Sequence, residues 1–389
     1  MLSGLRLHPG DPGDRHQADP AVFLVRPEHH EARFLENHAA ELDGVVLLGR
    51  HLAPYAPDSR EHAQGLRGDE LAQAVRGAGI DFVLDPDTAV LPYLTGDGLD
   101  AAFGRAELMS CARTVQLPLT ADQLEDTAAL CDLQVAVLAP QAKATYPSAA
   151  YFRFTSLKDP WLTISLQVAA MTQSLVRGGP IAVFVQVDLP ALRTGALANA
   201  AALYADALGS PGLAFLQVAG LDVERADPAD LLAYLHAAEV WQSQGFSPIA
   251  DRVGRFGVAA VAAGAAGMAC GTRVYRSVPD LELEPRFVRG GKIRYWTPAR
   301  GDRLAVEDAR ARRRRGSIPA CPVADCNALE DRSDADAVRW HNIHLTVQEL
   351  ALAQRDARSF AEVLRESPIG YVRDWGEVLD TAIRSSAQA

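Results

Sequence analysis

Two cysteines and two histidines near the end of the chain have the spacing of metal ligands. Four residues separate Cys321 from Cys326, and His341 and His344 lie three apart, so on a helix the two imidazoles would share one face. A structural zinc ion takes about four such ligands, often a cysteine pair from a turn and a second pair from a helix. The four residues form a candidate zinc site. The alternative is two unpaired cysteines and ordinary helix histidines.

A second set of candidates follows apolar runs earlier in the chain: Asp85, Asp188, Gln217, Asp251 and Arg273. Carboxylates can stabilise positive charge at a sugar C1′ or attack that carbon, and a glutamine amide can pair with a purine edge. We expect Asp85 and Asp251 to be catalytic. We expect Asp188, Gln217 and Arg273 to bind substrate.

These residues can meet only if the apolar runs before them form one sheet. Eight runs have the length and composition of buried strands: 21–25, 44–48, 81–84, 133–139, 181–187, 213–218, 247–250 and 267–270. Most are continuously apolar, which indicates strands buried on both faces of a parallel sheet. Helical patterns separate them, at 30–42, 70–77, 121–131, 160–176, 197–208, 229–244 and 255–263.

The alternation of strands and helices predicts a (β/α)8 TIM-like barrel, in which active sites lie at the carboxyl ends of the strands. An open doubly wound sheet is the alternative, but no Gly-x-Gly-x-x-Gly turn follows the first run. We expect three regions. Residues 1–20 form a flexible segment, residues 21–278 the barrel, and residues 279–389 a hairpin, a zinc-like module and helices.

Composition restricts the location and chemistry of the chain. Its 389 residues are 48% hydrophobic, which is enough for a large core, and no apolar run has the length of a membrane helix. We expect no membrane contact. Since residues 1–19 lack the apolar core of a signal peptide, we expect a cytoplasmic location.

Five cysteines are a sparse, odd set that argues against a disulfide framework. The oligomeric state is not indicated.

An arginine-rich run precedes the cysteines and contains Arg310, Arg312, Arg313, Arg314 and Arg315. The net charge of −11 argues against a protein that coats nucleic acid with its whole surface, but it permits one local basic patch. The last four arginines could neutralise phosphates without reading sequence, which makes tRNA or DNA a candidate partner. The alternative is a solvated helix face with acidic neighbours.

The C-terminal pattern resembles that of the tRNA-guanine transglycosylases, enzymes that insert queuine or its 7-deazaguanine precursors into nucleic acid. In that family a (β/α)8 barrel precedes a Cys-x-Cys-x2-Cys motif and a His-Asn-Ile segment on a helix. Cys321 and Cys326 have the spacing of the first and third cysteines, and His341-Asn342-Ile343 is similar to the histidine segment. The resemblance implies structural zinc, a purine-like base at the barrel mouth, and base exchange.

The metal-binding motif departs from the family at one position. Val323 stands where the family has its middle cysteine, so His344, Asp325 or water would have to provide the fourth zinc ligand.

The catalytic motifs depart further. Asp85 is similar to the first family aspartate by position only, and Gln217 is similar to the base-reading glutamine. Met268-Ala269-Cys270 resembles the final-strand segment, but Ala269 occupies the place of the nucleophilic aspartate. Base exchange would therefore need Asp251 or Cys270 as its nucleophile. The alternative for Cys270, and the more common one at the end of a barrel strand, is a small buried hydrophobic residue.

Three functions stay open. The first is a divergent transglycosylase-like protein that acts on or binds nucleic acid, with 7-deazaguanine-type base exchange at the mouth. The second is a non-catalytic nucleic-acid-binding or assembly subunit, which Ala269 and Val323 favour. The third is an unrelated small-molecule barrel enzyme, for which Gly254, Gly257 and Gly271 could build a phosphate-binding turn.

Overall fold

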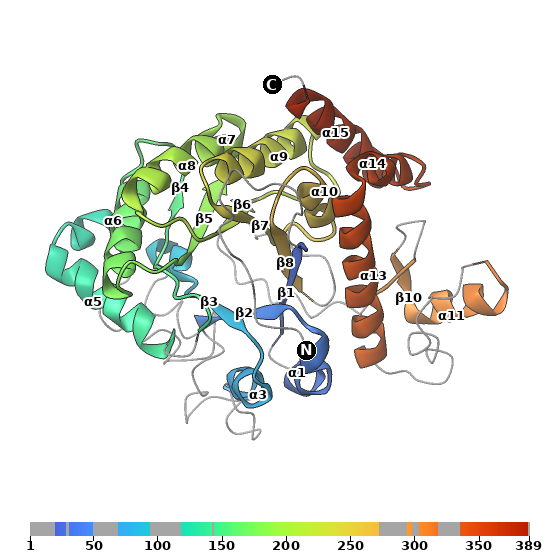
Figure 1. The fold of residues 1–389 in the computed structure, drawn as a ribbon, viewed down its shortest axis with the longest axis horizontal. Coiled ribbons are helices and arrows are strands. Elements are labelled where there is room, and N and C mark those ends of the chain that lie inside the picture. The colour runs from blue at the N-terminus through green and yellow to red at the C-terminus, as the bar shows by residue number, and fades with distance from the viewer. Residues whose placement is uncertain are drawn as a thin grey trace.

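A computed structural model describes residues 20–28, 31–49, 69–93, 118–141, 144–271, 294–297, 303–317 and 335–387. Eight parallel strands form one curled sheet with helices outside it (Figure 1). The strands are β1 (Val22–Arg26), β2 (Gly44–Leu48), β3 (Phe82–Asp85), β4 (Arg153–Phe154), β5 (Ala182–Asp188), β6 (Leu213–Ala219), β7 (Ser247–Asp251) and β8 (Gly267–Gly271).

The strand order is β3-β2-β1-β8-β7-β6-β5-β4, so the last strand pairs with the first. Two isolated parallel bridges, Val83 with Tyr146 and Ser148 with Ala182, join the segment before β4 to both β3 and β5. The two ends of the curled sheet are therefore linked through this segment. The arrangement is compatible with the TIM-like fold that the sequence predicts.

One predicted strand is wrong. Residues 133–139 belong largely to the helix α5 (Thr127–Leu138), and the fourth strand is the two-residue β4 instead. Leu130, Leu133 and Val137 are buried at helical spacing, and the Asp126 carboxylate caps the helix by accepting from the Ala128 N–H at 3.0 Å. The apolar run thus belongs to a helix that buries only one of its faces, and Val135 on the other side is exposed.

The other helices of this region are α1 (Ala32–His38), α3 (Glu70–Ala78), α6 (Pro160–Leu175), α7 (Leu189–Arg193), α8 (Ala196–Ala207), α9 (Pro228–Ser243) and α10 (Phe256–Ala262), with short 3-10 turns at Ala39–Glu41, Thr88–Tyr93, Ala121–Leu124 and Ala139–Gln141. Among them, α6, α7 and α9 each begin after an aspartate whose side chain caps the helix. Asp159 and Asp227 each precede a proline and cap α6 and α9. Proline fits the first helical position because no N–H is needed there.

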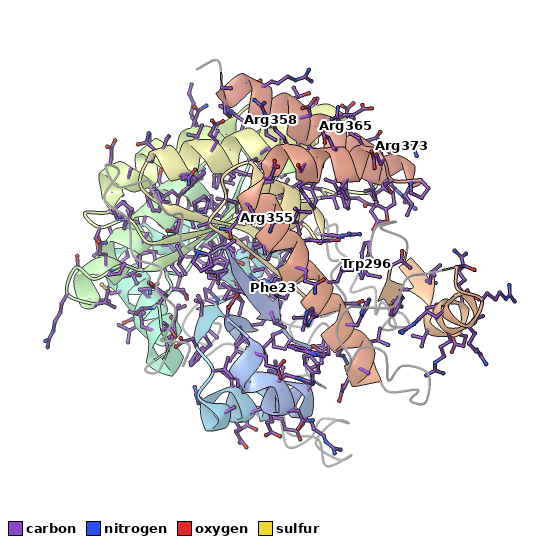
Figure 2. The ribbon with its side chains drawn as sticks, turned by 45° about the vertical axis from the view of Figure 1, so that its right-hand side comes forward. Phe23, Trp296, Arg355, Arg358, Arg365 and Arg373 are labelled. Atoms are coloured by element: carbon purple, nitrogen blue, oxygen red, sulfur yellow. The ribbon has the colours of Figure 1, made fainter. Side chains whose placement is uncertain are left out.

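The C-terminal region packs against the barrel helices. It contains β9 (Arg294–Trp296) and β10 (Arg303–Ala305), which pair antiparallel, then α11 (Val306–Arg314), α13 (Ala335–Arg355), α14 (Ala357–Arg365) and α15 (Gly370–Ser386). Trp296 lies beside α13 (Figure 2). The Trp375 indole N–H donates to the Val223 carbonyl at 2.8 Å, which fixes α15 to the loop after β6. Among the described residues, no helix has the length and apolar character needed to cross a membrane.

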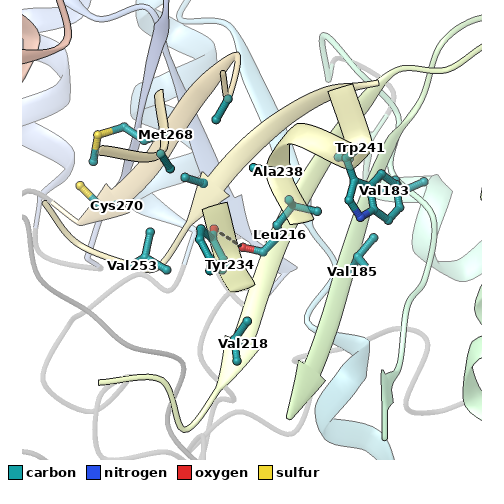
Figure 3. Packing of buried hydrophobic residues seen from close by; sticks show 14 of the residues in the cluster. Val183, Val185, Leu216, Val218, Tyr234, Ala238, Trp241, Val253, Met268 and Cys270 are labelled. Atoms are coloured by element: carbon teal, nitrogen blue, oxygen red, sulfur yellow. Dashed lines mark hydrogen bonds between the residues drawn. The ribbon is translucent and has the colours of Figure 1, made fainter. Parts of the chain in front are cut away.

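Alternate strand positions face two different cores. One set, including Val183, Val185, Leu216 and Val218, belongs to the outer core together with Tyr234, Ala238 and Trp241 of α9 (Figure 3). The other set forms a separate inner cluster on the concave face that includes Leu24, Val46, Val83, Phe184, Phe215, Ile249 and Ala269. Successive side chains of a strand point to opposite faces of the sheet, so only every second residue can face the concave side at the carboxyl ends of the strands.

Candidate functional site

On five strands, an apolar residue of the inner cluster is followed two positions later by a polar residue that faces the same concave side of the sheet. These residues are Arg26, Asp85, Gln186, Gln217 and Asp251, which follow Leu24, Val83, Phe184, Phe215 and Ile249. All five are buried. They form a polar layer above an apolar one, at the end of the sheet where barrel enzymes place their chemistry.

Arg26 connects the two predicted catalytic aspartates. Its Nε and Nη2 donate to the two carboxylate oxygens of Asp251 at 2.6 and 2.5 Å, and its Nη1 lies 2.9 Å from Asp85 Oδ2. Asp85 and Asp251 are both 0% exposed. Burial by itself would lower the pKa of Arg26, but the two carboxylates raise it above its ordinary value. The guanidinium is therefore permanently charged.

Three further donors reach Asp85. Tyr151 Oη and the Asp87 N–H donate to Oδ1, each at 2.9 Å, and Arg252 Nη2 donates to Oδ2 at 3.0 Å. Burial acts to raise the pKa of Asp85, but Arg26, Arg252 and these hydrogen bonds hold it below its ordinary value. Asp85 is thus a carboxylate at neutral pH and cannot serve as a proton donor.

The two glutamines extend the network from Asp251. Gln217 Nε2 donates to Asp251 Oδ2 at 2.7 Å, and Gln186 Nε2 donates to Gln217 Oε1 at 3.0 Å. A carboxylate can only accept hydrogen bonds, so Gln217 must turn its amide N–H towards Asp251 and its Oε1 towards Gln186. Gln186 must then turn its own amide N–H towards that oxygen. Gln186 Oε1 is then left as a buried acceptor with no hydrogen-bond partner among the described residues.

Strained backbone accompanies this network. Asp87 and Arg252 have φ angles of 54° and 60°, in the left-handed region that residues with a side chain rarely adopt. Both follow strand ends, and both contact Asp85. Such outliers cluster at functional sites, because surrounding contacts must hold them there. Here the hydrogen bonds to the buried Asp85 carboxylate hold Asp87 and Arg252 in this conformation.

The structure brings together three of the predicted site residues, Asp85, Gln217 and Asp251. Asp188 stands apart, because its carboxylate accepts from the Ala191 N–H at 2.8 Å and caps α7. Arg273 lies outside the described residues.

Cys270 does not face the mouth. It belongs to the outer core with Met268 and Val253, and burial raises the pKa of its thiol well above the ordinary value (Figure 3). A thiol that stays protonated is a poor nucleophile, so the interpretation of Cys270 as a replacement nucleophile is wrong. Ala269 faces inward but lies in the apolar layer, paired with Leu24.

His341 lies on α13 and is fully buried where this helix packs against β9. Its ring stacks on Tyr295 with 4.1 Å between centroids, and its Nε2 lies 2.8 Å from the Trp296 carbonyl oxygen. The carbonyl only accepts, so Nε2 donates to it, while Nδ1 has no hydrogen-bond partner among the described residues. His344 makes an edge contact with Trp340.

The predicted cysteine ligands cannot be placed beside these histidines. Cys321 and Cys326 lie outside the described residues. In the part of the chain that is described, no group of three or more His, Cys, Asp or Glu side chains could hold a metal ion.

The arginine run lies on α11. Glu307 and Asp308 occupy its first turn and Arg312, Arg313 and Arg314 its last, with Arg315 directly after it. This order also suits the helix dipole, which favours acids at the start and bases at the end. Arg314 and Arg315 are exposed.

Sequence reasoning missed Arg26, Tyr151 and Gln186 as site residues. For two of them a signal was present. Arg26 follows Leu24, and Gln186 follows Phe184, at the spacing that puts a strand residue on the same face. Gln186 is also the direct partner of Gln217 in the sheet register. Tyr151 lies just before β4, the strand that the sequence reading misplaced.

Comparison of the chain with protein-family models, curated proteins and solved structures gives no match. The function must therefore be argued from the site itself.

Proposed function

We propose that this chain is a transglycosylase-like protein that holds a purine-like base at the carboxyl end of its sheet and exchanges that base in nucleic acid. The observation that carries the proposal is the inward polar layer, in which two aspartates and two glutamines from four strands share one buried network. Gln186 Oε1 is a buried hydrogen-bond acceptor that has no donor among the described residues. The N–H groups on a purine edge supply such donors.

The two aspartates would have different roles. Asp251 would attack the sugar C1′, and the outgoing base would leave with the electrons of the glycosidic bond and take up a proton from water. Attack by an incoming base would then release Asp251. Asp85 is held ionised, so it would stabilise positive charge on the sugar. Arg26 holds both oxygens of Asp251, so the guanidinium must move aside before that carboxylate can attack.

A structural zinc ion and a nucleic-acid contact belong to the same proposal. Cys321, Cys326, His341 and His344 would bind the zinc. Support comes from His341, whose Nε2 donates to a backbone carbonyl, as metal-binding histidines commonly do, while Nδ1 has no partner among the described residues. Zinc here would hold the C-terminal module together. Arg312, Arg313, Arg314 and Arg315 would contact phosphates.

One observation favours a second candidate, a nucleic-acid-binding or assembly subunit without catalysis. Protein donors occupy both oxygens of Asp85 and both oxygens of Asp251, and neither residue reaches the surface. A carboxylate held in this way is stabilised as an acceptor and weakened as a nucleophile. In this case the network would stabilise the fold.

The deciding experiment is incubation of the full chain with labelled 7-deazaguanine bases and bulk tRNA or DNA. Asp251→Asn and Asp85→Asn should abolish incorporation. Asp188→Asn is the matched control, because it lies at the same end of the sheet and asparagine also caps helices.

Three outcomes separate the candidates. Loss of incorporation in the two network variants but not in the control supports base exchange. Binding of nucleic acid without incorporation by the unchanged chain supports the non-catalytic subunit. If the chain neither binds nor incorporates, the unrelated small-molecule enzyme becomes the better hypothesis.

A further inference from the structure

Three neighbouring helices on one side of the sheet carry almost no charge. α6 has no charged residue among its 16 residues, and the adjacent helices α5 and α8 have one each, Asp132 and Asp206. A helix on the surface of a globular protein usually has charged residues on its solvent side. The composition of these three helices is therefore unusual for helices that face water.

The outer surface of the same helices exposes large apolar side chains. In the described part of the chain six such side chains are exposed, and four of them lie here: Val135 on α5, Leu157 before α6, Leu175 at the end of α6 and Leu203 on α8. The sulfur atoms of Cys131 and Met171, each one helical turn before Val135 and Leu175, are 3.6 Å apart. Cys131, Val135, Met171 and Leu175 therefore belong to one surface, called the α5–α6 face below.

α10 shows how this chain treats another outer helix without charge. Phe256–Ala262 has no charged residue either, and six of its seven residues are buried because α13 and α15 pack over the helix. On the α5–α6 face, by contrast, Val135 and Leu175 are 55% and 52% exposed. Exposed groups of apolar side chains mark surfaces that another molecule covers. The α5–α6 face has the composition of a covered surface.

We propose that the α5–α6 face binds the same face of a second copy of this chain, which gives a two-fold symmetric dimer. The net charge of −11 makes two copies repel each other over most of their surfaces, whereas this face lets apolar side chains meet without that repulsion. α5 and α6 lie on the opposite side of the sheet from α11 and α13 (Figure 1). The dimer therefore leaves the arginine run accessible and does not depend on the proposed base exchange.

The charges around the α5–α6 face select an antiparallel arrangement of the two copies. Each outer helix of a barrel returns from the carboxyl ends of the strands to their amino ends, so the starts of α5 and α6 lie at one end of the face. Around this end are Asp122, Glu125, Asp126, Lys158 and Asp159, an acidic set. The opposite end of α6 is followed by Arg177, which is exposed. Antiparallel packing places Arg177 of each copy near the acidic end of the other.

The size of the face fits a reversible dimer. A helix of 16 residues is about 24 Å long, and packed neighbours lie about 10 Å apart, so α5 and α6 present roughly 500–600 Å² per copy. Two copies would bury roughly 1,000–1,200 Å², which is at the lower end of specific interfaces. We therefore expect a dissociation constant on the order of micromolar.

The test is sedimentation equilibrium of the full chain at protein concentrations from about 1 to 100 µM, which span that constant. The average mass should rise with concentration from the chain mass of 41.7 kDa towards twice that value. Labelling of Cys131 by iodoacetamide should slow over the same range, because the partly exposed thiol lies in the face that the second copy covers.

Matched variants separate this face from unspecific association. Val135→Glu and Leu175→Glu change exposed residues, so the fold should persist, which circular dichroism checks. Each should weaken the dimer roughly a hundredfold, since a charge is costly to bury in an apolar interface. Val363→Glu, at a 43% exposed position of α14 outside the face, is the control and should dimerise like the unchanged chain.

The orientation has its own variant. Arg177→Glu makes both ends of the face acidic and should weaken the dimer roughly tenfold, whereas Arg225→Glu, at an exposed position after β6, should change it little. Equal effects of these two variants would refute the antiparallel arrangement.

Two results would overturn the inference as a whole. A chain that stays monomeric over the whole concentration range would show that a different partner covers the α5–α6 face. A dimer that survives Val135→Glu and Leu175→Glu, or that Val363→Glu weakens to the same extent, would show that two copies meet through another surface.

Discussion

Arg26 at the end of β1 and Asp251 at the end of β7 form a buried two-pronged ion pair across the intervening strand β8. The same guanidinium also contacts Asp85 at the end of β3. One cation therefore holds together the carboxyl ends of strands that are far apart in the chain. The polar layer exists in this form only while that cation is present.

Replacing Arg26 should destabilise the fold strongly. Arg26→Met would leave two buried carboxylates without their shared cation, and losing one partner of a buried pair costs about 3–5 kcal/mol. The free energy of unfolding from urea titration measures the effect. Arg225→Met is the control, because Arg225 has an 87% exposed side chain in a surface pair and should cost no more than about 1 kcal/mol. A similar loss in both variants would show that the buried pair has no special role.

Asp85 should make the fold sensitive to acid. Its pKa is lowered in the folded state, so its contribution to stability is complete above the unfolded pKa of about 3.9 and is lost as the pH falls through the lower, folded value. In Asp85→Asn this part of the acid dependence should disappear, although the variant is less stable at neutral pH. Urea titrations of both proteins between about pH 5 and 2.5 test this. Parallel curves would contradict it.

Cys270 should be unreactive in the folded chain. Its thiol is fully buried in the outer core and its pKa is raised, so little thiolate forms even at pH 8. Iodoacetamide labelling followed by peptide mass spectrometry should modify Cys131, which is partly exposed, well before Cys270. Unfolding in urea should abolish this difference. Rapid labelling of Cys270 in the folded protein would reopen its interpretation as a nucleophile.

Most of the sheet could be predicted from the sequence because buried parallel strands are continuous apolar runs. β2 coincides with its predicted range, and β5 to β8 each lie within a residue of theirs. The fourth strand could not be predicted, because β4 consists of Arg153 and Phe154 alone, while the apolar run at 133–139 lies largely in α5. Local pattern cannot reveal a two-residue strand that neighbouring strands hold in place.

The site was predictable only in part, for a related reason. Asp85, Gln217 and Asp251 stand at the ends of apolar runs, and the carboxyl ends of parallel strands meet at one edge of a sheet. The ion pair between Arg26 and Asp251 depends on β8 lying between β1 and β7, which is a property of the strand order in the whole sheet. In the sequence, a single arginine after an apolar run gives no indication that Asp251 will be its partner.

The arginines at the end of α11 should bind nucleic acid if the proposed contact exists. Arg314→Ser with Arg315→Ser should weaken binding to tRNA or DNA about equally for all sequences, and should lower the slope of log affinity against log salt by roughly two. Arg355→Ser with Arg358→Ser is the control, because it removes the same charge from an exposed part of the C-terminal helices (Figure 2). Equal losses in both double variants would indicate a general charge effect.

The purified chain should contain roughly one zinc ion, and His341 should be needed to keep it. His341→Ala removes the ring whose Nδ1 has no partner among the described residues, whereas His236→Ala removes an exposed ring on α9 and serves as the control. Elemental analysis should find zinc in the unchanged chain and in the control but much less in His341→Ala. Chelation should then make the C-terminal region sensitive to protease, since the free energy of metal binding is also folding free energy. Zinc-free protein that resists protease equally well would show that His341 is a packing residue, held by Tyr295 and the Trp296 carbonyl.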